Sequence, residues 1–158
     1  MDHIQFQLST PVGKLFLVAA PQGLKGVYVK RQKIALVKRL TQLTPQEIIL
    51  SKTVRQIEEY FAGKRKTFDL NLYPTGTLFQ QQVWRQLVKI PFGTTVSYRD
   101  IAKRINNPKA VRAVGSANGK NPYCIIVPCH RVIAADGSIG GYAGGIAMKK
   151  QLLALEQQ

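Results

Sequence analysis

The chain changes character at Tyr73-Pro74-Thr75-Gly76, a turn-forming stretch, and this change constrains the architecture more than any other feature. Upstream of it, alternating apolar and polar residues predict strands; downstream, apolar residues recur at helical spacing. A chain of 158 residues can form one domain or two small ones. We therefore expect an α/β domain over residues 1–74 and a mainly helical domain over residues 75–158.

The first domain is predicted to begin with a β-meander. Residues 4–8 alternate apolar and polar side chains, as a half-buried strand does. Residues 14–20 and 24–29 are further strand-like segments, separated by turns that contain proline and glycine. Residues 30–43 are basic with apolar side chains near helical spacing, which predicts a short helix.

A second helix of this domain has signals at both ends. Thr44 is suited to cap it, Pro45 to occupy its first position and Glu47 to complete a capping box. Gly63 is placed to end the helix. The predicted apolar face consists of Ile48, Val54, Ile57, Tyr60 and Phe61.

The second domain is predicted to contain a helix–turn–helix unit. A helix over residues 77–89 places Trp84 in the core. Ser97 then caps a short helix over residues 98–105, and Asn106-Asn107-Pro108 leads into a second helix over residues 109–118. Such a pair is a common DNA-docking unit. Arg112 is the only arginine among the small residues of the second helix, so it is either a solvated charge or a probe inserted into DNA.

The charge balance favours a polyanionic partner. Lysine and arginine number 23 against 8 aspartate and glutamate residues, a formal net charge of +15. Nucleic acid is the usual partner of such a chain, and a basic surface that only aids solubility is the alternative. No apolar run could span a membrane, no export signal is evident, and two cysteines make no disulfide framework. We expect a cytoplasmic, nucleoid-associated protein.

Cys129 is the candidate nucleophile. It follows the apolar run 125–127 and Pro128, so we expect a short buried strand with Cys129 at its end. A free thiol has a pKa of about 8.5 and needs a base, for which His130 is the nearest candidate. Adjacent side chains of an extended chain point to opposite faces, so adjacency alone does not establish contact, and a water could bridge the two side chains. The alternative is a buried, inert Cys129. By the same periodicity, Cys124 should face away from Cys129.

Two features near the C-terminus point to a pocket. Residues 138–145 are rich in glycine but lack the lysine of a phosphate-binding loop, so we expect a wall of a base pocket, with Tyr142 as its flat face. Glu156 falls in the last turn of a helix over residues 146–156, where the helix dipole disfavours an acid. This placement indicates a specific partner for Glu156, with a frayed terminus as the simpler alternative.

With these motifs the chain resembles the O6-alkylguanine-DNA alkyltransferases, most closely the bacterial members. The resemblance covers nearly the whole chain and depends mainly on residues 111–115, on Asn121-Pro122 and on residues 126–132. It implies a ribonuclease-H-like first domain and a winged-helix second domain. It also implies a DNA repair protein that acts once, taking the alkyl group from O6 of guanine, and from O4 of thymine, onto Cys129.

The resemblance assigns roles to the other site residues. His130 would be the base for Cys129 through a water, Glu156 would hold the His130 tautomer, and Asn121 would brace the turn before the cysteine. Arg112 would fill the space left by the flipped base, and Tyr98 would displace a phosphate and donate to the leaving oxygen. The remaining pocket and DNA contacts would come from Val132, Tyr142, Ala143, Arg99 and Asn107.

The partner implied is double-stranded DNA with alkylated bases, bound by a monomer without a cofactor. Some relatives hold a structural zinc in the first domain, but here that domain has no cysteine and only His3, so we expect no metal. Three other functions stay open: a non-catalytic lesion-binding protein, a Cys-His-Glu hydrolase and a helix–turn–helix regulator. The first lacks the cysteine, the second needs turnover, and the third needs strong sequence preference.

Overall fold

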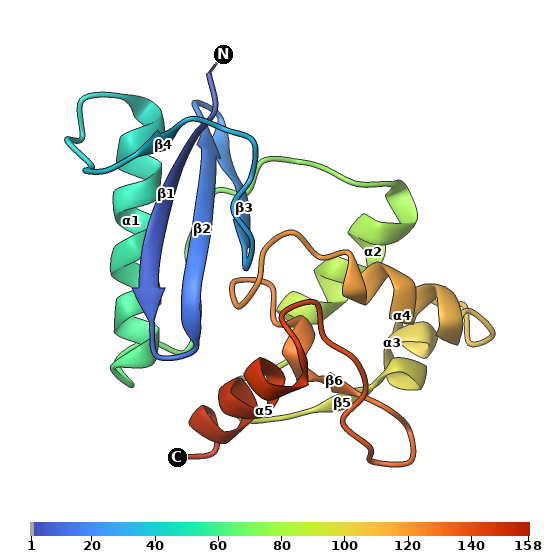
Figure 1. The fold of residues 1–158 in the computed structure, drawn as a ribbon. Coiled ribbons are helices and arrows are strands. Elements are labelled where there is room, and N and C mark those ends of the chain that lie inside the picture. The colour runs from blue at the N-terminus through green and yellow to red at the C-terminus, as the bar shows by residue number, and fades with distance from the viewer. Residues whose placement is uncertain (1) are drawn as a thin grey trace. The chain divides into compact units, whose positions relative to one another are not determined.

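The computed structural model describes residues 2–158. The chain forms two compact units, one ending at Pro74 and one spanning Thr75–Gln158, and each has its own core. Figure 1 shows the elements of both units in chain order. Within residues 2–158 no helix has the length and apolar character needed to cross a membrane.

The first unit is a four-stranded sheet with one helix packed on it (Figure 1). The predicted meander is confirmed, because the first three strands pair antiparallel in sequence order. The fourth strand pairs parallel with β1, which gives the sheet order β3-β2-β1-β4. The strands are β1 (Ile4–Thr10), β2 (Gly13–Ala20), β3 (Gly23–Tyr28) and β4 (Leu36–Val37).

The predicted helix over residues 30–43 is wrong. This segment is irregular apart from β4, and Gln5, a fully buried residue of β1, holds it extended. The Gln5 side chain donates to the carbonyl oxygens of Gln32 and Ile34, at 3.1 and 3.0 Å, and accepts from the Gln32 amide at 2.8 Å. These long-range bonds satisfy the backbone of the segment, so tertiary pairing overrides its local helical spacing.

Helix α1 (Pro45–Phe61) begins and ends where its sequence signals predict. Thr44 accepts the Glu47 amide, and Gly63 follows the helix with a φ of 76°. The capping box is wrong, because the Glu47 carboxylate accepts from the Thr41 amide instead. Ile48 is also misplaced: at two residues from Leu50 it lies on the opposite side of the helix and is 53% exposed. The buried face consists of Leu50, Thr53, Gln56, Ile57 and Tyr60.

The second unit contains four α-helices and a short parallel pair of strands (Figure 1). Trp84 is in the core as predicted, and its Nε1 donates to the Ala117 carbonyl at 2.8 Å, which ties α2 to α4. The elements are α2 (Leu78–Val88), β5 (Val96–Ser97), α3 (Tyr98–Arg104), α4 (Val111–Gly119), β6 (Val132–Ile133) and α5 (Ile146–Leu155).

The helix–turn–helix pair is present as α3 and α4. Ser97 caps α3 in a capping box with Asp100, and Asn106 adopts a φ of 58° in the turn. The α4 helix begins at Val111, later than predicted, because the Ala110 amide closes a turn on the Asn107 carbonyl. Arg112, the second residue of α4, is exposed.

The segment before Cys129 is not a strand. The amides of Ile126 and Val127 bond back to the carbonyls of Cys124 and Tyr123, so residues 123–127 form compact turns. The Asn121 side chain fixes them, since its Nδ2 donates to the Val127 carbonyl at 2.8 Å and its Oδ1 accepts the Tyr123 amide at 3.0 Å. These local bonds replace a strand ladder.

Ala135-Asp136-Gly137, a sequence typical of hairpin turns, forms a turn here without a hairpin. The Asp136 carboxylate accepts from the Ser138 amide at 2.9 Å, which closes the turn. The preceding strand, β6, pairs parallel with β5 instead of with a returning strand.

Candidate active site

Cys129 begins a short 3-10 helix, Cys129–Arg131, in which all three residues are buried. The side chain of Asn118 donates to the Cys129 carbonyl at 3.3 Å. Burial raises the pKa of the Cys129 thiol, while a hydrogen bond from the Asn121 side chain and the positive charge of Lys149 oppose that rise. The thiol therefore rests protonated near neutral pH, beside groups that would stabilise a thiolate.

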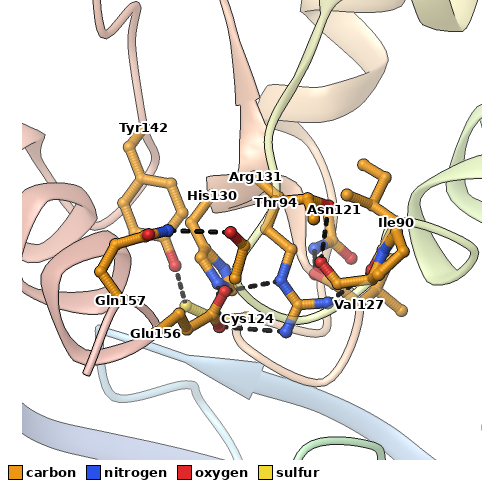
Figure 2. Close-up of polar contacts among 12 residues, drawn as sticks. Ile90, Thr94, Asn121, Cys124, Val127, His130, Arg131, Tyr142, Glu156 and Gln157 are labelled. Atoms are coloured by element: carbon orange, nitrogen blue, oxygen red, sulfur yellow. Dashed lines mark hydrogen bonds and ion pairs between the residues drawn. The ribbon is translucent and has the colours of Figure 1, made fainter.

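His130 and Arg131 share one buried carboxylate, that of Glu156, at the end of α5 (Figure 2). The Nε2 of His130 lies 2.7 Å from Glu156 Oε2. Arg131 donates from Nε to Oε1 at 2.7 Å and from Nη2 to Oε2 at 3.0 Å. Its Nη1 donates to the Ile90 carbonyl at 2.7 Å. Glu156 is thus held by two side chains, and the frayed-terminus alternative is wrong.

This arrangement selects one tautomer of His130. A carboxylate accepts only, so Nε2 carries the hydrogen and donates to Glu156. Nδ1 is buried, and within the described residues it has no hydrogen-bond partner. Its lone pair is therefore available to accept a proton, as a base must. Within residues 2–158 no hydrogen bond joins the His130 ring directly to Cys129.

The pKa of His130 is lowered, first by burial and further by the positive charges of Arg131 and Lys149, while Glu156 opposes the change. At neutral pH the site therefore contains a thiol and a neutral imidazole. Deprotonation of Cys129 becomes favourable only when the proton can pass to His130 and the imidazolium can be stabilised by Glu156.

Because burial lowers the pKa of His130 below its ordinary 6.5, the unfolded chain binds a proton before the folded one does. We expect the free energy of unfolding to fall as the pH drops from about 6.5 toward the pKa of His130 in the folded protein. Above a pH of about 6.5, His130 should not affect the free energy of unfolding. Urea unfolding at a series of pH values, with histidine ring signals followed by NMR, checks this. A His130 ring that titrates at or above 6.5 would contradict the expectation.

Two site residues, Arg131 and Lys149, could not be found by sequence reasoning, because long cations are rarely fully buried. Lys149 lies on α5 and donates from Nζ to the carbonyls of Val132 at 2.7 Å and Gly141 at 3.1 Å. Its Nζ lies 6.0 Å from the centre of the Tyr98 ring. The one signal for Lys149 was its position beside the apolar residues Met148 and Leu152 on the last helix.

The remaining predicted residues divide into two sets. Tyr98, Val132 and Tyr142 are buried or half-buried: burial and then the Cys129 charge raise the pKa of Tyr98, Lys149 donates to the Val132 carbonyl, and Tyr142 bonds to Cys124. The other set is exposed and comprises Arg99, Asn107, Arg112 and Ala143. Among residues 2–158 no cluster of three or more histidine, cysteine or acidic side chains is arranged to hold a metal ion.

Comparison with known proteins decides the family. Residues 7–74 match the model of the 6-O-methylguanine DNA methyltransferase ribonuclease-like domain, and residues 78–158 match that of its DNA-binding domain. The chain belongs to this family. The expected combination of a ribonuclease-like domain and a DNA-binding domain is therefore confirmed.

Individual relatives agree along nearly the full length. A methylated-DNA–protein-cysteine methyltransferase of Methanosarcina acetivorans is 48% identical over 148 residues, which cover 93% of this chain and 94% of the relative. The Mycobacterium tuberculosis protein of that name is 45% identical over 150 residues, 95% of this chain and 90% of the relative. The crystal structure of Mycobacterium tuberculosis OGT in complex with DNA has a TM-score of 0.87 and 41% identity, covering 98% of this chain and 92% of that one.

Proposed function

We propose that this protein repairs DNA by transferring the alkyl group of O6-alkylguanine, and of O4-alkylthymine, irreversibly to Cys129. The observation that supports this most directly is that the buried Cys129 is followed by His130, whose Nε2 is hydrogen-bonded to Glu156. The name of the relatives, methylated-DNA–protein-cysteine methyltransferase, describes the same reaction. Among the alternatives, the lesion-binding protein does not need this relay.

The transfer is a single displacement at the alkyl carbon. The Cys129 sulfur forms a bond to that carbon as the bond from carbon to O6 breaks, and the thiol proton passes through a water to His130 Nδ1. The oxygen that leaves gains negative charge, which the half-buried Tyr98 hydroxyl would stabilise by donation. The displaced base takes up one proton at a ring nitrogen, which balances the thiol proton passed to His130, so the products are an S-alkylcysteine and an unmodified base. A thioether is stable, so each molecule acts once and needs no cofactor.

The lesion must leave the duplex to reach this site. Cys129 is 4% exposed, and the alkyl carbon of a stacked base is inaccessible, so the nucleotide has to be extruded. Arg112 on α4 is exposed and would fill the gap in the stack, while the exposed Arg99 and Asn107 would bind the backbone. We place the protein as a monomer on chromosomal DNA in the cytoplasm, in keeping with its net charge of +15.

One experiment tests the proposed function. The purified protein is incubated with a duplex containing O6-methylguanine, and its intact mass is measured over time. We expect a gain of one methyl group per protein molecule and no further reaction. Tight binding to the lesion with no gain in mass would contradict the proposal and favour a lesion-binding protein, and continued turnover would favour a hydrolase.

Replacing Arg112 with alanine should slow transfer from duplex DNA by about a hundredfold, because no long side chain then fills the gap that the extruded base leaves in the stack. Transfer from the free base O6-benzylguanine should change little, since that substrate needs no extrusion. Single-turnover rates on both substrates measure this. Lys120→Ala is the matched control, since it removes an exposed cation just after the same helix. Equal losses on the two substrates would contradict the role of Arg112.

A further inference from the structure

The glycine-rich loop of residues 138–145 has neither helix nor strand, and it lies against Tyr98 and Lys149. Side chains outside the loop hold it at two points. Lys149 Nζ donates to the Gly141 carbonyl at 3.1 Å, and Tyr142 Oη lies 2.7 Å from Cys124 Sγ. Within the loop, the Gly145 amide donates to the Tyr142 carbonyl at 3.0 Å and closes the last turn before α5.

The backbone of this loop runs close to two aromatic rings. A Cβ atom on Gly140 would lie 3.0 Å from the Tyr98 hydroxyl oxygen, and one on Gly144 would lie 2.9 Å from the Tyr142 ring. The loop therefore passes from Tyr98 to Tyr142, and the Tyr142 ring packs over its own loop. The ring is positioned at one end by this backbone and at the other by Cys124 (Figure 2).

Cys124 is well suited to hold the Tyr142 hydroxyl in place. It is 8% exposed and belongs to the compact turns that Asn121 fixes before Cys129. Burial, together with the charge of a Cys129 thiolate, raises the pKa of Cys124 to about 12, although the bond to Tyr142 opposes this. The Cys124 thiol therefore stays protonated and neutral, and it makes a hydrogen bond instead of acting as a nucleophile.

We propose that Cys124 is a positioning residue that sets the width of the alkyl-base pocket by holding the Tyr142 ring through its thiol. This inference rests on the proposed function. A tethered ring keeps a narrow pocket that orients a small alkyl group for attack. A released ring moves with its glycine-rich loop, which orients a methyl group less well but admits a larger group.

The test compares transfer from duplexes containing O6-methylguanine and O6-benzylguanine. In Cys124→Ala, which removes the hydrogen bond, the ratio of the benzyl rate to the methyl rate should rise about tenfold over wild type. Cys124→Ser retains a hydroxyl and should restore the wild-type ratio. Tyr142→Phe should reproduce the alanine effect, and combining Tyr142→Phe with Cys124→Ala should add nothing, because both remove the same bond.

Ile126→Val is the matched control, since it trims a buried side chain of the same turns without touching the hydrogen bond, and it should leave the ratio unchanged. An unchanged ratio in Cys124→Ala, with or without a lower Tm, would overturn the inference. A wild-type protein that takes up no alkyl group would instead overturn the proposed function. Hydrogen exchange at residues 140–145 then still tests the tether: it should be faster in Cys124→Ala and Tyr142→Phe, and equal exchange would refute the tether.

Discussion

Replacing Cys129 with serine is expected to abolish alkyl uptake while leaving affinity for DNA unchanged. A serine hydroxyl at this buried position is a far weaker nucleophile than a thiol that His130 can deprotonate. The groups that bind phosphate are exposed cations such as Arg99, which the substitution does not alter. Intact mass measures uptake, and fluorescence anisotropy measures binding. Binding of both proteins should weaken steeply with salt, as phosphate contacts require.

Cys124→Ser is the control for this experiment and should still take up one alkyl group per molecule. The expectation that Cys124 faces away from Cys129 on a strand is wrong, since the segment is turned and Ile125 has a φ of 73°. Both thiols are buried, and a negative charge on Cys129 would raise the pKa of Cys124. What distinguishes them is their partners: Tyr142 for Cys124, and Asn121 and Lys149 for Cys129. Peptide mapping that finds the alkyl group on Cys124 would contradict the assignment.

The parts of the fold that could be predicted are those set by local chemistry. Thr77 and Ser97 cap helices because their side chains accept amides three residues ahead, and such signals are legible in the sequence. The wrong predictions concern segments held by distant side chains. Gln5, on the neighbouring strand, holds residues 32–35 by hydrogen bonds. These residues are far from Gln5 in the sequence, so no local sequence pattern predicts the bonds.

The site was predictable only in part for the same reason. The motif containing Cys129 and His130 is contiguous, so the sequence displays it directly. The contact of His130 with Glu156 joins residues 26 positions apart, and it was expected only through the resemblance. Arg131 was not assigned a role, because its buried position depends on the same distant carboxylate. A buried cation becomes predictable only once its counter-charge is located.

Replacing Glu156 with glutamine is expected to slow alkyl transfer by about a hundredfold at neutral pH. The carboxylate raises the pKa of His130, against the larger lowering by burial. Without its charge the pKa of His130 falls further and His130 becomes a weaker base. Less Cys129 is then deprotonated near neutral pH, so the rate should rise only at higher pH, where the thiol ionises without the help of His130. Single-turnover rates measured across a pH series give this shift.

The same substitution leaves the Arg131 guanidinium buried without its counter-charge, which should destabilise the fold by about 3–5 kcal/mol. A second variant separates this loss of stability from the loss of proton transfer. Combining Glu156→Gln with Arg131→Met removes both charges and should recover much of the free energy of unfolding. It should not recover the rate or the original pH profile, because His130 still lacks a carboxylate. Recovery of the rate together with stability would show that Glu156 only anchors the C-terminal helix.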